Sequence, residues 1–181
     1  KLYELCKKLN ITPYMLLLSL YYVLLYKYTG QDEFVVGSPI TGRDNIQTSN
    51  IIGMFVNTLP LKATVNKNTS FHNLLSQVMN NCIRAFENQL YPFDELVKEL
   101  DIPRDSSTTP IFSTMFTFQN TGVPSLELNG LNVKYYIPDN KTAKFDFSLE
   151  ISPIGNDLDL NLEYCIDLFD KEFMQDFLKH Y

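Results

Sequence analysis

The stretch IIGMFVNTLPLK, Ile51–Lys62, is the least ordinary dozen residues of this chain. It is apolar and rich in β-formers, yet it contains Gly53, the polar pair Asn57 and Thr58, and a proline. A buried polar group without a partner costs about 1–3 kcal/mol. The stretch therefore predicts a strand that begins after Gly53, in which Asn57 and Thr58 have polar partners.

Composition limits the class of protein. The 181 residues are 45% hydrophobic and 20% charged, which is typical of a globular domain, and the formal net charge is −6. No cluster of Lys and Arg occurs, so nucleic acid and anionic membrane are not expected as partners. The longest apolar segment is shorter than a membrane span, and no signal peptide is expected. The chain opens on Lys1, which suggests a piece of something larger.

The cysteines favour a reduced compartment. Cys6, Cys82 and Cys165 form an odd set without CxxC spacing, so neither a disulfide framework nor a zinc site is expected. We therefore expect a cytoplasmic location.

The first two thirds of the chain predict alternating helices and strands. Thr12 and Pro13 begin an apolar helix that Gly30 ends, and Ser70 caps an amphipathic one. The other predicted elements are a strand at Glu33–Gly37, ended by Ser38 and Pro39, a short helix at Phe93–Leu100, a strand at Ile111–Phe118, and a helix from Asp170 to Tyr181.

The last third predicts two β-hairpins. One turns at Asn129–Gly130, a typical type I′ pair, between Leu126 and Ile137. The other joins Phe145–Ile151 to Leu158–Ile166 through a turn of Pro153, Gly155 and Asn156. Acidic residues alternate with the apolar ones in the second hairpin, so one face of the sheet should be polar. The sequence predicts a single α/β (α+β) unit with a mixed sheet.

No complete active site is visible in the residues themselves. The two histidines, His72 and His180, are far apart in sequence, whereas catalytic zinc usually has three protein ligands. No nucleophile elbow, phosphate-binding glycine loop or metal motif occurs. Neither a metal nor a directly bound cofactor is expected.

Three ordered motifs resemble the condensation domains of nonribosomal peptide synthetases. Residues 52–59 (IGMFVNTL) are similar to the family motif GxFVNT, residues 88–94 (NQLYPFD) to NQxxPFE, and residues 104–111 (RDSSTTPI) to RDxSRNPL. Gly37–Pro39, Gly42–Arg43 and Lys144–Asp146 also fit the family. Three motifs in order over about seventy residues make a specific signal.

The chain departs from the family in small ways and in one large way. Leu90, Lys62, Thr108 and Thr109 replace residues usual in the family. The catalytic signature HHxxxDG, which lies on the N-terminal lobe in the family, is absent from these residues. The resemblance implies that residues 1–181 are the C-terminal lobe of a two-lobed, chloramphenicol-acetyltransferase-like fold, without its N-terminal lobe.

The resemblance also implies an activity and its partners. Condensation domains join an acyl or peptidyl thioester to the amine of an aminoacyl thioester, and both are tethered to phosphopantetheine arms of carrier proteins. The substrates meet in a tunnel between the lobes, where positioning supplies much of the rate. The implied partners are the N-terminal lobe, the upstream and downstream peptidyl carrier proteins, and an adenylation domain.

Particular residues take expected roles from this resemblance. Asn57 and Thr58 either line the tunnel and contact a pantetheine amide or fix the backbone, and the structural alternative is weighted more heavily. If Asn57 lines the cleft, its side chain should point away from the core of the sheet. Arg43 either pairs across the cleft with the Asp of the missing motif or is a plain surface charge. Structural roles are expected for Gly53, Phe55, Pro92, Phe93, Arg104, Asp105 and Pro110.

Two alternatives stay open. The chain could belong to an epimerization or ester-forming relative, or to a non-catalytic module that only docks carrier proteins.

If the chain is one lobe of two, it should expose an apolar patch, with the Asn129–Gly130 hairpin or the loop at Gly122–Pro124 as candidates.

Overall fold

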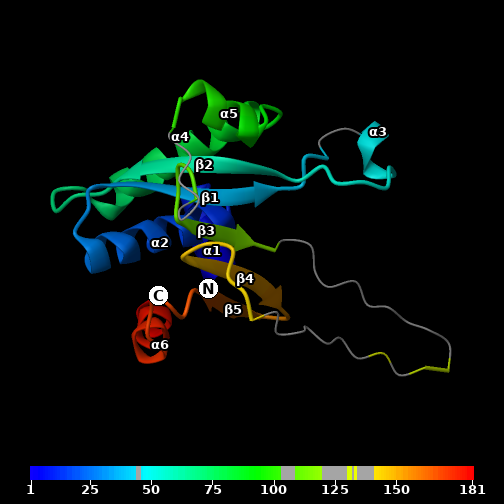
Figure 1. Ribbon diagram of the computed structural model, residues 1–181. Coiled ribbons are helices and arrows are strands. Elements are labelled where there is room, and N and C mark those ends of the chain that lie inside the picture. Colours follow the sequence, from blue (N-terminus) through cyan, green and yellow to red (C-terminus); the bar gives the residue numbers. More distant parts are fainter. Residues whose placement is uncertain (44–45, 103–108, 120–129, 132, 134–140) are drawn as a thin grey trace.

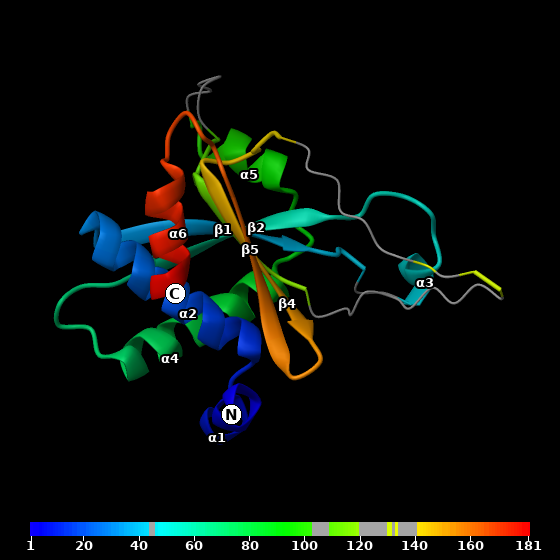
Figure 2. The same cartoon turned by 90° about the horizontal axis from the view of Figure 1, so that it is seen from below.

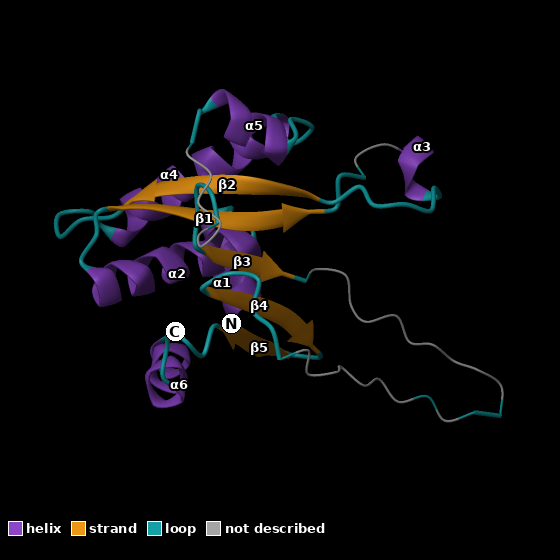
Figure 3. Ribbon diagram, viewed as in Figure 1, coloured by secondary structure: helices purple, strands orange, loops and turns teal. Residues whose placement is uncertain are grey.

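The computed structural model describes residues 1–43, 46–102, 109–119, 130–131, 133 and 141–181. Its elements (Figure 3) are α1 (Leu2–Leu9), α2 (Pro13–Thr29), β1 (Glu33–Ile40), α3 (Ile46–Ser49), β2 (Asn57–Thr64), α4 (Phe71–Glu87), α5 (Phe93–Glu99), β3 (Thr114–Phe118), β4 (Phe147–Ile154), β5 (Asp157–Tyr164) and α6 (Lys171–His180).

The strands form one mixed sheet in the order β2-β1-β3-β4-β5 (Figure 1). The central strands β1, β3 and β4 are parallel, while β2 and β5 pair antiparallel at the two sides. The predicted α/β class with a mixed sheet is therefore confirmed. The parallel strands all end at the same side of the sheet, the side from which the connection between β1 and β2 extends (Figure 1).

Helix α2 is the centre of the core. Its side chains pack with residues of β1, β2, β3, β4, α4 and α6 in one cluster, which explains why the helix is apolar nearly all round. Thr12 accepts a hydrogen bond from the Met15 amide, and Gly30 ends the helix in the left-handed conformation, as predicted.

Tyrosine hydroxyls tie α2 to the sheet. Tyr14 donates to Ser38 Oγ at 2.8 Å, Tyr22 donates to the Leu61 carbonyl at 2.7 Å, and the hydroxyl of Tyr21 contacts that of Thr114. Burial of these rings raises the pKa of all three tyrosines, so the hydroxyls stay protonated at neutral pH.

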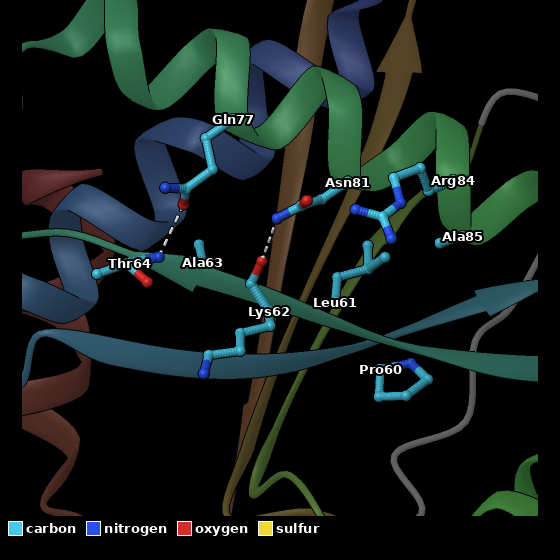
Figure 4. Close-up of a pocket in the computed structure, with 9 residues that line it drawn as sticks. All are labelled: Pro60, Leu61, Lys62, Ala63, Thr64, Gln77, Asn81, Arg84 and Ala85. Atoms are coloured by element: carbon cyan, nitrogen blue, oxygen red, sulfur yellow. Dashed lines mark hydrogen bonds between the residues drawn. The ribbon is translucent and has the colours of Figure 1, made fainter.

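Helix α4 covers the outer edge of β2 (Figure 4). Gln77 accepts a hydrogen bond from the Thr64 amide, and Asn81 donates one to the Lys62 carbonyl, both at 2.8 Å. Pro60 has no amide hydrogen to offer at this edge. The side chains of α4 thus satisfy polar groups that an uncovered edge strand would leave open to strand addition.

The second face of the sheet is polar, as the alternating acidic residues predict. On β4 and β5 the residues that face away from the core include Ser148, Glu150, Asp159 and Glu163, whereas Leu149 and Ile151 are fully buried on the other face. An aromatic cluster covers part of this polar face near β1. The Phe112 ring lies against Gly37 so closely that a Cβ there would come within 2.3 Å of it.

Several predicted boundaries are wrong. Strand β1 continues through Ser38 and Pro39 to Ile40, because these residues pair with Leu59, Thr58 and Asn57 of β2. Pro153 lies inside β4 beyond its pairing with β3, so only Gly155 and Asn156 form the turn. Strand β3 begins at Thr114 rather than Ile111, α5 ends at Glu99, and α1 is an additional helix that the sequence patterns do not predict.

Three further predictions concern the start of α6, the first hairpin and the cysteines. Asp170 precedes α6, as predicted, although its side chain makes no capping hydrogen bond. The predicted Asn129–Gly130 hairpin lies almost entirely outside the described residues. All three cysteines are free, and Cys6 and Cys82 are buried.

No described helix is by itself long and apolar enough to cross a membrane. Helices α1 and α2, which meet at a bend of 99°, would pass that test only when taken together.

Candidate functional site

Asn57 connects the first two motifs of the sequence. Its side-chain amide donates hydrogen bonds to the carbonyls of Gln89, at 3.0 Å, and Tyr91, at 2.8 Å. Its side-chain carbonyl accepts a hydrogen bond from the Phe93 amide at 3.1 Å. One residue at the start of β2 therefore holds three backbone groups of the segment between α4 and α5.

This contact replaces a helix cap. Pro92 stands at the N-cap position of α5, where it cannot accept a hydrogen bond through its side chain. The Phe93 amide is one of the unsatisfied groups at the start of that helix, and Asn57 supplies its acceptor from another element. The expected structural roles of Pro92 and Phe93 thus have a geometric basis.

The two residues of the polar pair take opposite directions. By the alternation of β2, Asn57 lies on the same face as the buried Leu59 and Leu61, and Thr58 lies on the polar face. The Asn57 side chain is directed to the backbone of residues 89–93, which is the contact that the structural alternative expects. Thr58, half-buried and paired with Pro39 of β1, is the member of the pair that faces outwards.

Phe93 and Phe112 join α5 to the segment before β3. Their ring centroids are 5.5 Å apart, and the Phe145 ring lies 5.7 Å from that of Phe112. The Phe112 amide donates to the Pro110 carbonyl at 3.0 Å around Ile111, whose φ is 74°. This tight turn is strained for a β-branched residue and directs the Phe112 ring onto Gly37.

Arg43 organises the connection between β1 and β2. Its guanidinium donates to the carbonyls of Thr48, of Ile51 at 2.9 Å, and of Gly53 at 2.8 Å. The same group lies 4.4 Å from the centre of the Phe55 ring. Arg43 is therefore not a plain surface charge, because it binds three carbonyls and an aromatic face.

The connection that Arg43 holds is strongly exposed. We call residues Ile46–Val56 the arm; it carries α3 and stands away from the sheet and helices in both views (Figures 1 and 2). Ile46 is 89% exposed, Ile52 102% and Met54 88%, and Ile51 and Val56 are also exposed. Five exposed apolar residues therefore lie on the arm, and Ile52, Met54 and Val56 among them belong to the first motif. The loop expected at Gly122–Pro124 lies outside the described residues.

The described residues show no catalytic constellation. They contain no group of His, Cys, Asp and Glu able to hold a metal ion. Burial raises the pKa of the Cys82 thiol to about 12, so this cysteine is not poised as a nucleophile. Arg104 and Asp105 lie outside the described residues. The site is therefore a framework of backbone-holding side chains, Asn57 and Arg43, beside an exposed apolar arm.

Comparison with known proteins places this framework in a family. The described residues form a mixed α/β fold and show no catalytic centre, and the family description "Condensation domain" matches residues 1–181. The chain belongs to the condensation-domain family. The family that the three sequence motifs predicted is therefore confirmed.

Similar curated proteins include large peptide synthases. The chain is 42% identical over 180 residues to gramicidin S synthase 2 of Brevibacillus brevis and 41% identical over 180 residues to tyrocidine synthase 2 of Brevibacillus parabrevis. Each alignment covers 99% of this chain but only 4% and 5% of the synthases. The chain thus spans a small fraction of the relatives that it matches.

Solved structures support the fold. A four-domain nonribosomal peptide synthetase superimposes with a TM-score of 0.88, and the condensation domain of monacolin K polyketide synthase with 0.86, each at 22% identity. Both comparisons cover 98% of this chain; they cover 15% of the synthetase chain and 41% of the condensation domain. The expected chloramphenicol-acetyltransferase-like fold is therefore confirmed.

Sequence reasoning missed the partners of Asn57 and Arg43. The polar pair inside an apolar run indicated that partners exist, but backbone groups 32 to 36 positions away carry no side-chain signal. The Gly42–Arg43 pair stands out in the sequence only through the family resemblance. No pattern in the sequence shows that its guanidinium binds carbonyls of the arm.

Proposed function

We propose that this chain is the C-terminal lobe of a condensation domain in a nonribosomal peptide synthetase. The complete domain forms an amide between an acyl or peptidyl thioester and an aminoacyl thioester. The phosphopantetheine arms of two carrier proteins deliver the substrates, and an adenylation domain belongs to the same synthetase. We place this synthetase in the cytoplasm. The odd set of three cysteines without CxxC spacing is the basis for proposing a reduced compartment.

The exposed arm is the observation that carries this proposal. It places five apolar side chains in solvent on a segment with no core of its own, whereas exposed apolar surface of this kind commonly marks an interface. The solved condensation domain is more than twice the length that this chain matches. We assign the arm to contact with the remainder of the domain, the N-terminal lobe.

The proposal gives different roles to Thr58, Asn57 and Arg43. Thr58, on the polar face of β2, is proposed to line the tunnel. Asn57 is proposed to act on the tunnel wall indirectly, by holding residues 89–93 against β2. Arg43 is proposed to sit at the junction of the lobes, where guanidinium hydrogens beyond those that bind the arm could meet a carboxylate. None of these groups supplies a general base, so the lobe contributes positioning rather than proton transfer.

One observation favours a second candidate, a non-catalytic interaction module. The X-domain from teicoplanin biosynthesis superimposes with a TM-score of 0.88 at 19% identity, and a structure of that X-domain is a complex with OxyB. The same fold therefore also occurs in a domain that forms a complex with another protein. The much higher identity to peptide synthases favours the condensation role here.

An aspartate in the arm tests the proposed contact. In the complete synthetase, Ile52→Asp should lower the rate of amide formation at least about tenfold, because a charge buried at an interface costs more than about 1.4 kcal/mol. The same change in the 181-residue chain should leave the unfolding midpoint unchanged, since Ile52 is fully exposed there.

Ile166→Asp provides the matched control. Ile166 is also an exposed isoleucine, at 81%, but it follows β5 rather than lying in the arm. Its substitution should leave amide formation unchanged. Equal rates for Ile52→Asp and Ile166→Asp would remove the assignment of the arm to the other lobe.

A further inference from the structure

The arm is held in shape by a residue outside it. Arg43 follows β1, and its guanidinium binds carbonyls at three positions of the arm, Thr48, Ile51 and Gly53. It also covers the Phe55 ring. A segment that lacks a hydrophobic core is thereby fixed at four points by one side chain.

We propose that Arg43 and Gly42 form a staple that holds Ile46–Val56 in one conformation and presents Ile52 and Met54 as a preformed apolar surface. The identity of the docking partner, the rest of the condensation domain, depends on the proposed function. The staple itself does not, because every contact that forms it lies within this chain.

The contacts require the shape of a guanidinium. Its planar fork donates from two nitrogens in fixed directions, which lets Nη1 reach two carbonyls while Nη2 reaches a third. The flat face remains available for Phe55. A lysine ammonium keeps the charge, but it cannot span these carbonyls and stack on the ring at the same time.

Gly42 provides an independent constraint on the same segment. Its φ is +62°, and a Cβ at this position would lie 1.9 Å from the Phe55 carbonyl oxygen. The backbone of the arm therefore returns to within contact of the residue before Arg43, and only glycine leaves room for it. Gly155 has nearly the same φ, +61°, but a Cβ added there would meet no other atom within 4 Å.

A preformed arm lowers the cost of docking. A flexible apolar segment would lose conformational entropy on binding, because each side chain that becomes immobilised gives up rotamer freedom. Ordering by Arg43 before docking removes part of that cost. Arg43 is therefore a positioning residue, which acts through the arm.

Thermolysin cleavage of the 181-residue chain tests the staple directly. The protease cuts before large apolar residues, which the arm supplies, and the cleavage rate follows the population of the opened segment. Arg43→Lys should accelerate cleavage within residues 46–56 by about tenfold, because lysine loses part of the charge-assisted hydrogen bonds that hold the arm closed. Circular dichroism should show an unchanged fold.

Two matched controls separate the staple from general effects. Arg84→Lys makes the same chemical change on the exposed side of α4, away from the arm, and should leave cleavage unchanged. Gly42→Ala should accelerate cleavage in the arm, whereas Gly155→Ala, which carries the same backbone strain without the clash, should not. Arm cleavage in Arg43→Lys no faster than in Arg84→Lys would overturn the staple.

The rate of amide formation by the complete synthetase tests whether the activity depends on an ordered arm. Arg43→Lys should slow amide formation severalfold although the charge is retained, and Arg84→Lys should not. A full rate for Arg43→Lys would overturn the claim that ordering of the arm matters. If Arg43→Lys loosens the arm in the isolated chain but Ile52→Asp has no effect on amide formation, the staple stands and the proposed function of the arm fails.

Discussion

Tyr21→Ala should cost about 3–5 kcal/mol of the free energy of unfolding, the range found for large aromatic side chains in a protein core. Tyr21 is fully buried, and its ring lies 5.4 to 6.4 Å, centre to centre, from four other aromatic rings. These rings belong to β3, β4, α6 and the final residue: Phe116, Phe147, Phe177 and Tyr181. Removing the Tyr21 ring opens a cavity where the helices meet the sheet.

A smaller substitution at Tyr21 separates the contribution of the hydroxyl from that of the ring, and a substitution at Tyr3 is the control. Tyr21→Phe keeps the ring but removes the contact with Thr114, so we expect a loss of about 1–2 kcal/mol. Tyr3→Ala, at a half-exposed position of α1, should change stability by less than about 0.5 kcal/mol. Urea unfolding of the 181-residue chain measures all three. A loss below about 1 kcal/mol for Tyr21→Ala would contradict this packing.

Asn57→Ala should destabilise the chain by about 2–3 kcal/mol, because two carbonyls and one amide lose their partner together. Asn57→Asp should not restore stability. It keeps an acceptor for the Phe93 amide but sets carboxylate oxygen against the carbonyls of Gln89 and Tyr91. Asn81→Ala, which removes a single exposed hydrogen bond to the Lys62 carbonyl, is the matched control and should cost about 0.5–1 kcal/mol.

The complete synthetase separates two roles of Asn57. If Asn57 positions the tunnel wall through residues 89–93, amide formation by the folded fraction of Asn57→Ala should slow severalfold. An unchanged rate in the folded fraction, together with lost stability, would make Asn57 purely structural. A slow rate without any loss of stability would instead favour direct contact with substrate.

The parts of the fold predictable from sequence are those coded by neighbouring residues. Thr12 with Pro13, and Gly30, mark the ends of α2 because capping depends on local backbone geometry. The alternation in β4 and β5 likewise reports which residues face the core. Ser38 and Pro39 misled the prediction of β1, since their place in the strand depends on pairing with Leu59 and Thr58, which lie far along the chain.

The candidate site was predictable only in outline. Asn57 stood out because a polar residue in an apolar run needs a partner, yet its partners are backbone groups, which every residue possesses. The first motif predicted a strand that begins after Gly53. In the structure Ile52 and Met54 are exposed instead, because β2 begins only at Asn57. Apolar composition alone does not say whether a segment packs on its own core or on a partner.

Amide formation is the most direct measurement of the central claim, that this chain is the lobe of a condensation domain which supplies framework but no general base. Two carrier proteins loaded with acyl and aminoacyl thioesters are incubated with the folded 181-residue chain or with the complete condensation domain, and the amide product is quantified by mass spectrometry. We expect product with the complete domain and none above background with the chain alone. Turnover by the chain alone that survives repurification and disappears on substitution of one of its residues, or no turnover by the complete domain, would contradict the claim.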